Sequence, residues 1–188
     1  VVGADVMSAI TDYTDRTTCV LFGDGAGAVL VEPAVEDGLE IIGFEHHIDG
    51  VGRGALMMRG GGSLNPASHE TIDKKWHYIW QDGQAVFKFA VRNTEEICRR
   101  LMEKHNVKAS DVALFVSHQA NRRIIMSAAD RLGFTESQVM INIEDYGNTT
   151  AATIPLALDD AIKQGRLKKG DLVVLTSVGA GFTVGSDR

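Results

Sequence analysis

Two side chains that can donate hydrogen bonds to a ligand follow the ends of predicted strands. His118 follows the apolar run 112–116 (VALFV) with only Ser117 between them, and Asn148 follows the segment 140–147 (MINIEDYG) and opens a predicted helix. In open α/β sheets, ligands bind beside the carboxyl ends of the strands, and this placement favours a functional role for both residues. Two structural alternatives stay open: His118 as a solvated or helix-capping histidine, and Asn148 as a helix N-cap.

Neither cysteine is a candidate nucleophile. Cys19 belongs to a predicted apolar strand and Cys98 to the apolar face of a predicted helix, settings in which a thiol is buried and its pKa is raised. Their distant spacing indicates neither a disulfide scaffold nor a zinc cluster and fits a reducing, cytosolic setting. Ser177 lacks the GxSxG motif of a hydrolase. No metal site is predicted, because the other histidines lack ligand spacing: His46, His47, His69, His77 and His105.

Two glycine-rich runs lack the context of a phosphate-binding loop. Residues 23–27 (GDGAG) are followed by a predicted strand, whereas a dinucleotide-binding loop needs a helix at that point. Residues 59–63 (RGGGS) follow no strand and lack the lysine of a P-loop. We interpret the first run as a turn between strands and the second as a flexible loop.

The chain is acidic overall, but its basic residues are clustered. Its 188 residues include 19 Lys or Arg and 25 Asp or Glu, a net charge of −6, so general attraction to nucleic acid or to a membrane is not expected. No apolar run reaches membrane-helix length, and no signal peptide is visible. Two predicted helices carry the clustered cations: Lys88, Arg92, Arg99 and Arg100 on one, and Arg122, Arg123 and Arg131 on the other. These cations form either a local basic patch or solvated helix faces with intrahelical ion pairs.

The elements that position these residues alternate between strands and helices. Strands are predicted at 18–22, 28–32, 39–44, 112–116, 139–143 and 172–176, and helices at 86–101, 122–132 and 148–164. Gly133 ends the second helix, and Pro155 should kink or interrupt the third. Residues 46–69 form a long excursion without clear periodicity. Fully apolar strands alternating with helices predict an α/β protein whose sheet is covered on both faces.

An internal similarity suggests duplication. The runs 19–22 and 25–27 (CVLF, GAG) resemble 173–176 and 179–181 (VVLT, GAG) at an offset of 154 residues, each interpreted as strand, glycine turn and strand. Repetition of a supersecondary unit usually means duplication, although two glycine turns can also coincide by chance. The chain begins at Val1, as the interior of a longer protein would.

Four segments together resemble the β-ketoacyl-acyl carrier protein synthase III family of the thiolase superfamily. They are residues 14–33 (TDRTTCVLFGDGAGAVLVEP), 117–124 (SHQANRRI), 146–158 (YGNTTAATIPLAL) and 179–186 (GAGFTVGS). The resemblance implies a thiolase-like fold: duplicated βαβαβαββ halves in an α-β-α-β-α layering. Residues 1–45 would end the first half, 46–85 would be an excursion and connection, and 86–188 would form the complete second half.

The resemblance also implies the reaction. A primer acyl-CoA, usually acetyl-CoA, condenses with malonyl-acyl carrier protein (ACP) to give 3-oxoacyl-ACP, CoA and CO2, initiating type II fatty acid synthesis. His118 and Asn148 match two members of the family's Cys-His-Asn set. The nucleophilic Cys belongs to the first half and is absent here, so the chain alone is expected to be inactive. His118, as a neutral donor, and Asn148 would stabilise the enolate oxygen formed by decarboxylation.

Further positions match family residues that line the channel or meet the carrier protein. The implied substrate-binding residues are Arg16, Gly83, Phe87, Asn121, Arg123 and Phe182. Lys88, Arg123 and Arg131 are implied in docking the acidic carrier protein, for which a local basic patch would steer association. No cofactor or metal is implied beyond the substrates acyl-CoA and malonyl-ACP.

The resemblance further implies a cytoplasmic homodimer. Two alternatives remain: a thiolase-fold acyltransferase of secondary metabolism, of the alkylquinolone type, and a non-catalytic fragment. The choice of primer is not readable from this chain, because the residues that set it belong to the absent half.

Overall fold

A four-stranded mixed sheet forms the centre of the computed structural model, which describes residues 1–33 and 40–187. The strand order is β3-β8-β7-β6, with the bounds Phe44–Ile48, Thr183–Asp187, Val173–Gly179 and Leu114–Ser117. β6 runs parallel to β7, whereas β7–β8 and β3–β8 are antiparallel. The predicted α/β class is confirmed.

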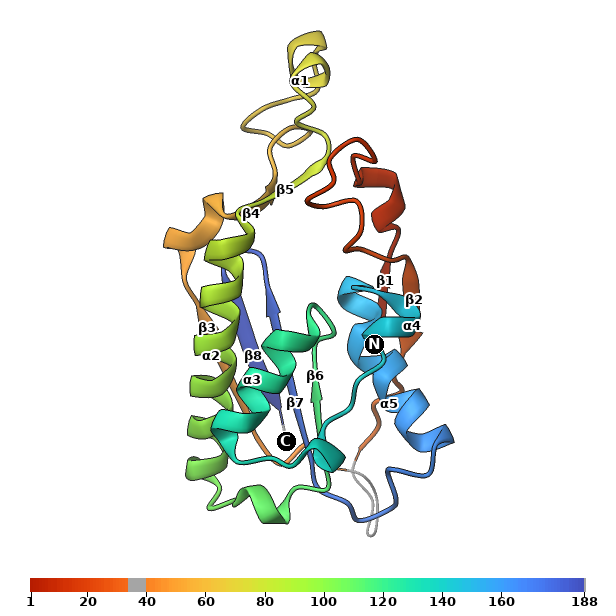
Figure 1. Ribbon diagram of the computed structural model, residues 1–188, viewed down its shortest axis with the longest axis vertical. Coiled ribbons are helices and arrows are strands. Elements are labelled where there is room, and N and C mark those ends of the chain that lie inside the picture. The colour runs from red at the N-terminus through yellow and green to blue at the C-terminus, as the bar shows by residue number, and fades with distance from the viewer. Residues whose placement is uncertain (34–39, 188) are drawn as a thin grey trace.

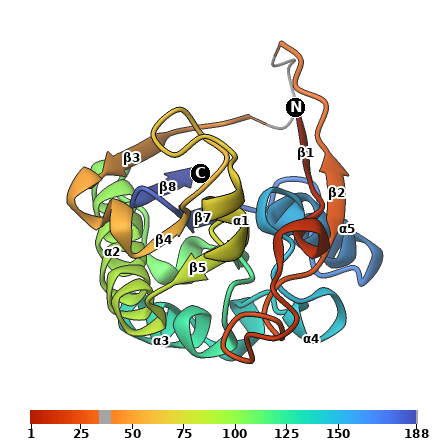
Figure 2. The same cartoon turned by 90° about the horizontal axis from the view of Figure 1, so that it is seen from above.

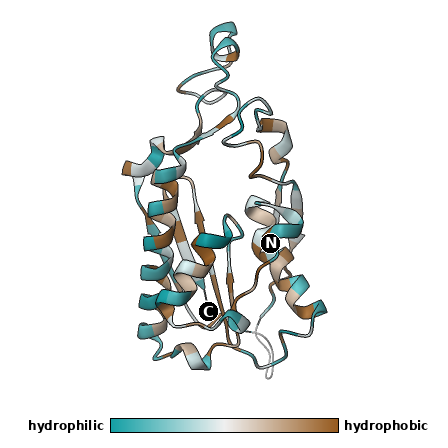
Figure 3. Ribbon diagram, viewed as in Figure 1, coloured by the Kyte–Doolittle hydropathy of each residue, from teal (hydrophilic) through white to brown (hydrophobic). Residues whose placement is uncertain are grey.

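Helices cover both faces of this sheet (Figures 1 and 2). The helices α2 (Gly83–Lys104) and α3 (Arg122–Leu132) pack on one face, and α5 (Thr153–Lys163) packs on the other. Successive residues of β6 serve the two faces in turn, because side chains alternate along a strand: Phe115 belongs to the cluster with α2 and α3, and Leu114 belongs to the cluster with α5. Both faces of β6 are therefore apolar. Figure 3 colours the ribbon by residue hydropathy.

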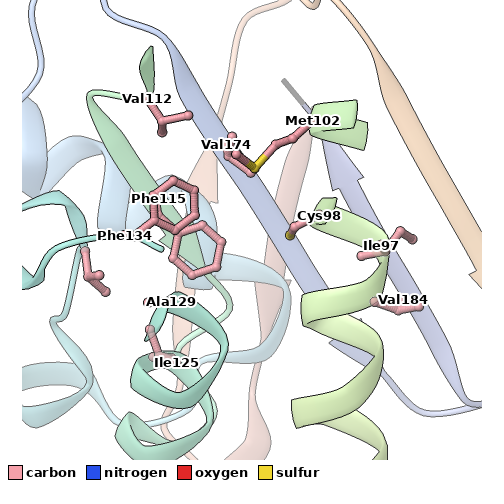
Figure 4. Packing of buried hydrophobic residues seen from close by; sticks show 11 residues of the cluster. Ile97, Cys98, Met102, Val112, Phe115, Ile125, Ala129, Phe134, Val174 and Val184 are labelled. Carbon is pink, nitrogen blue, oxygen red and sulfur yellow. The ribbon is translucent and has the colours of Figure 1, made fainter. Parts of the chain in front are cut away.

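The larger core lies between the sheet and the helices α2 and α3 (Figure 4). Phe115 of β6 stacks on Phe134, with ring centroids 5.0 Å apart. Cys98 and Met102 of α2 and Ile125 of α3 complete this side, and Cys98 has no exposed surface. The close packing of this cluster holds β6 and α3 in fixed positions relative to each other.

Smaller elements surround the sheet. An antiparallel pair joins β1 (Val2–Asp5) to β2 (Gly25–Ala28), and a second joins β4 (Leu56–Met58) to β5 (Ile79–Gln81). The protruding lobe at the top of Figure 1 carries the short helix α1 (His69–Asp73). The remaining short helices are α4 (Ile143–Tyr146) and the 3-10 turns Met7–Ile10, Gly50–Gly54, Ala109–Asp111, Glu136–Gln138 and Thr150–Ala152.

The strand predictions near the N-terminus were wrong. Residues 18–21 form turns, and Phe22 makes only a single bridge, to Asn148. The strand β2 consists of the glycine run itself and ends at Ala28. The strand forms there because glycine permits close approach: a Cβ at Gly27 would lie 2.5 Å from Pro155. The two GAG runs therefore do not occupy equivalent positions, since Gly179 ends β7. Of the predicted strand 39–44, residue 39 lies outside the described residues, and strand β3 begins only at Phe44.

The predicted strand 139–143 and the predicted helix 148–164 also needed correction. Residues 139–143 make only a single bridge, between Val139 and Phe115, before α4 begins. The helix predicted from 148 begins at Thr153, which places Pro155 in its first turn. No helical acceptor is available there for an N–H group, so proline causes no interruption. The helices 86–101 and 122–132 and the strands 112–116 and 172–176 were predicted correctly to within a few residues.

Candidate active site

His118 lies directly after β6 and is held by the neighbouring strand. Its backbone N–H donates to the carbonyl of Thr176 in β7 at 2.8 Å, and its own carbonyl accepts from the N–H of Ala120 at 2.9 Å. The side chain is buried, and its Nδ1 has no hydrogen-bond partner among the described residues. Burial lowers the pKa of His118 to about 4 because the charged form loses its hydration. The imidazole is therefore neutral at physiological pH.

Asn148 lies in the turn between α4 and α5 and is held by the N-terminal region. Its N–H donates to the carbonyl of Leu21 at 3.0 Å, and its carbonyl accepts from the N–H of Gly23 at 2.9 Å. Its side-chain Oδ1 accepts from the N–H of Thr150 at 3.0 Å. Since Oδ1 is engaged, the Nδ2 donors remain for another acceptor.

The capping alternatives for the two residues are wrong. The N-cap of α3 is Asn121, whose side chain accepts from the N–H of Arg123, so His118 does not cap that helix. The N-cap of α5 is Ala152, four residues beyond Asn148. His118 is not solvated either, because only 8% of its surface is exposed.

One cavity of about 470 Å³ brings His118 and Asn148 together. The N-terminal segment contributes Thr17, Leu21 and Phe22 to its wall. Most of the residues implied in substrate binding also line it: Gly83, Phe87, Asn121, Arg123 and Phe182. The Arg123 guanidinium lies over the Phe87 ring, 5.8 Å from its centroid. A second hollow of about 380 Å³ also reaches His118 and Asn148.

The remaining predicted residues lie elsewhere. Arg16 is exposed and does not line the cavity, although its neighbour Thr17 does. Lys88 lines a separate hollow beside β3. Arg131 is near the C-terminal end of α3, whereas Arg123 is near its N-terminal end, and Arg131 lies 3.8 Å from the carboxylate of Glu95. The structure thus groups the three proposed docking residues less tightly than a single patch would.

Sequence reasoning missed the residues that support Phe182. The Phe182 ring stacks on Phe89 with centroids 4.2 Å apart, and both line the cavity. A Cβ at Gly52 would lie 2.1 Å from the Phe182 ring, so glycine is required for this approach. The only sequence signal was the glycine at position 52 itself.

Sequence reasoning also left Gln119 without a role. This buried side chain donates to the carbonyls of Ser117 and Met140, at 2.9 and 3.1 Å, and accepts from the N–H of Asn142 at 3.0 Å. It therefore ties the segment before Asn148 to strand β6, which ends just before His118. The available signal was a polar residue three positions beyond the apolar run 112–116.

The cysteines take no part in this cavity. Burial raises the pKa of Cys98 to about 11, as predicted for a thiol on an apolar helix face. Cys19 lies in a turn and is half-buried, so its predicted place in an apolar strand was wrong. Among the described residues, no His, Cys, Asp and Glu cluster could hold a metal ion, and none of the helices could span a membrane.

The helix-covered mixed sheet, with His118 and Asn148 in one cavity, is the arrangement of a thiolase-like protein. The crystal structure of 3-oxoacyl-[acyl-carrier-protein] synthase III from Aquifex aeolicus VF5 matches with a TM-score of 0.86 at 41% identity, covering 99% of this chain and 55% of that one. The priming β-ketosynthase from the R1128 polyketide biosynthetic pathway matches with a TM-score of 0.84 at 34% identity, covering 98% of this chain and 54% of that one. These matches confirm the predicted thiolase-like fold.

The family follows from the sequence matches. The family model described as 3-oxoacyl-[acyl-carrier-protein (ACP)] synthase III matches residues 1–50, and its C-terminal counterpart matches residues 102–187. A relative from Solibacter usitatus (strain Ellin6076), named beta-ketoacyl-[acyl-carrier-protein] synthase III, is 58% identical over 188 residues, covering 99% of this chain and 57% of the relative. The chain belongs to the β-ketoacyl-ACP synthase III family, and it spans slightly more than half the length of the relatives it matches.

Proposed function

We propose that this chain forms part of an enzyme that condenses a primer acyl-CoA, such as acetyl-CoA, with malonyl-ACP and releases CO2. The observation that carries the proposal is the cavity shared by a neutral His118 and by Asn148, whose Oδ1 is already occupied. Two uncharged donors in a buried site are suited to an oxygen that gains negative charge during the reaction. Decarboxylation of a malonyl thioester produces such an oxygen as the enolate forms.

The chemistry of the side chains assigns a different step of the reaction to each of them. A cysteine from outside this chain would carry the primer as a thioester, because neither Cys19 nor Cys98 lines the cavity and burial raises the pKa of Cys98. Breaking the bond to the malonyl carboxylate releases CO2 and moves its electron pair into the enolate, whose oxygen accepts hydrogen bonds from His118 and Asn148. The enolate carbon then attacks the thioester, and the cysteine leaves as thiolate.

The CoA and carrier-protein contacts are proposed from the cavity wall and the free cations. Phe87, Asn121 and Arg123 would line the pantetheine channel, and Arg16 would approach the nucleotide from outside the cavity. Arg123 and Lys88 have no ion pair within the described part of the chain, whereas Arg122 pairs with Glu144 at 2.6 Å. Unpaired cations on an acidic chain are suited to steer an acidic carrier protein. A cytoplasmic homodimer completes the proposal.

A second candidate uses the same chemistry in secondary metabolism. The match to the R1128 priming ketosynthase favours it, because that protein acts in a polyketide pathway. The higher identity to a relative named as a β-ketoacyl-ACP synthase III favours fatty acid synthesis. The two are distinguished by comparing fatty-acid and polyketide carrier proteins as malonyl donors.

The test replaces the proposed donor in the full-length protein that contains this chain. Asn148→Ala is expected to lower the rate of malonyl decarboxylation by about a hundredfold or more, which is the usual cost of removing one hydrogen-bond donor from an oxyanion site. The rate of acyl transfer to the cysteine should stay within about threefold of the unchanged protein. Asn93→Ala is the matched control, since this asparagine donates to the Phe89 carbonyl on α2 and does not line the cavity. Equal loss of both half-reactions in Asn148→Ala would refute the assigned role.

A further inference from the structure

Thr150, two residues after Asn148, has a backbone conformation that threonine rarely adopts. Its φ is +48°, and among the described residues it is the only β-branched residue with a positive φ; the other non-glycine cases are Lys75 and Asn106. For a β-branched side chain this region is a genuine outlier, because the branched Cβ clashes with the backbone. The surrounding structure must therefore hold Thr150 in place.

The carboxylate of Asp5 supplies that restraint from the other end of the chain. Asp5 is the last residue of β1, and its Oδ2 accepts hydrogen bonds from the Thr150 hydroxyl and from the N–H of Ala151 at 3.0 Å. The backbone of β1 also lies against this turn, since a Cβ at Gly3 would be 2.3 Å from the Ala151 carbonyl oxygen. Asp5 therefore meets the turn in a position fixed by close backbone packing.

Thr150 in turn contacts the side-chain amide of Asn148. In its left-handed conformation, Thr150 directs its N–H to Oδ1 of Asn148 at 3.0 Å. An N–H group can bond only to the oxygen of the amide, so this contact decides which end of the Asn148 side chain is left for the cavity. The contacts form a continuous path from Asp5 through Thr150 to Asn148.

We propose that Asp5 is a positioning residue that sets the orientation of the Asn148 amide by holding Thr150 in its left-handed conformation. This inference rests on the proposed function, in which the Nδ2 donors of Asn148 face the enolate oxygen. Asp5 does not line the cavity and touches no reacting atom. Its effect would be confined to the step in which Asn148 acts, because a small misplacement of a reacting group can cost about a hundredfold in rate.

The test compares half-reactions in the full-length protein. Asp5→Ala is expected to lower kcat for malonyl decarboxylation by about 10- to 100-fold, with KM and acyl transfer to the cysteine within about threefold. Asp5→Asn should recover most of that loss, because both bonds go to one oxygen and an amide oxygen can accept them. Thr150→Ser, which keeps the hydroxyl, should resemble the unchanged protein.

Asp24→Ala is the matched control. Asp24 lies in the same N-terminal region and accepts two bonds from Ser8, from the N–H at 2.7 Å and the hydroxyl at 2.6 Å, but none from the turn after Asn148. It should lower thermal stability without separating the half-reactions. If Asp5→Ala has no effect on decarboxylation, or lowers both half-reactions to the same extent, the inference is overturned.

A crystal structure of Asp5→Ala separates this inference from the proposed function. If the unchanged enzyme fails to decarboxylate malonyl-ACP, the proposed function fails, and the positioning role is then judged from the structure alone. Thr150 leaving the left-handed region, with loss of its bond to Asn148, supports the role. An unchanged turn overturns it.

Discussion

The two ends of the chain contribute to the site in different ways. Residues 90–187 contain all of the buried apolar residues of the described chain except Met7. Residues 1–33 instead leave Val2, Val20 and Leu30 largely exposed and are held through contacts with the turn around Asn148. The later region is stabilised by burial of apolar surface, whereas the earlier one is positioned by backbone hydrogen bonds and glycine contacts.

Because of this difference, the two proposed donors, His118 and Asn148, are positioned by different kinds of contact. His118 follows a strand within the apolar core, so its position comes from packing. Asn148 is bonded to Leu21 and Gly23, and its neighbours Thr150 and Ala151 are bonded to Asp5. One donor of the proposed oxyanion site thus depends on the core and the other on the docking of the N-terminal region.

The largest expected effect is in the core. Phe115→Ala should lower the free energy of unfolding by about 3–5 kcal/mol, because the fully buried ring leaves a cavity beside Phe134. Leu30→Ala in the N-terminal region should change it by no more than about 0.5 kcal/mol. Urea unfolding of the full-length variants measures both, and similar losses would contradict the comparison between the two regions.

A smaller effect is expected where the N-terminal region meets the turn. A Cβ at Gly23 would lie 2.2 Å from the carbonyl oxygen of Tyr146, so Gly23→Ala must displace one backbone from the other. We expect a loss of about 1–3 kcal/mol in unfolding free energy, as for overpacked sites, together with reduced malonyl decarboxylation. Gly54→Ala is the control, because the space around it is open. Gly23→Ala with unchanged stability and activity would show that this contact does not position Asn148.

The smallest effect concerns the pH dependence that His118 gives to stability. The unfolded imidazole binds a proton below about pH 6.5, whereas the buried one does so only near pH 4, so the unfolded state takes up more protons between these values. Stability therefore falls as pH falls through this window, by about 1 kcal/mol from pH 7 to pH 5.5. His118→Gln should lose that part of the dependence in urea unfolding at the two pH values. An identical decrease in both proteins would contradict the buried, neutral histidine.

The bounds of an element were predicted reliably wherever its own residues supplied both the periodicity and the terminating residue. The helix 122–132 was predicted with its observed bounds, because its apolar periodicity ends at Gly133, which adopts φ +82° as a helix-ending glycine does. The predictions failed where a contact with a distant segment decided the outcome. The glycine run 25–27 was taken for a turn, but it forms β2 by pairing with β1 and packing on Thr149 and Pro155.

The sequence by itself determined the α/β class, the family, and His118 and Asn148 as the candidate pair, because these rest on local periodicity and on motifs of adjacent residues. Only the tertiary structure decided that both line one cavity, that Arg16 lies outside it, and that Asp5 bonds to Thr150 across 145 positions of the chain. The physical reason is that a hydrogen bond or a close glycine contact between distant segments leaves no periodic pattern in either of them. The burial that keeps His118 neutral likewise comes from elements folded around it, and its own neighbours in the sequence do not reveal it.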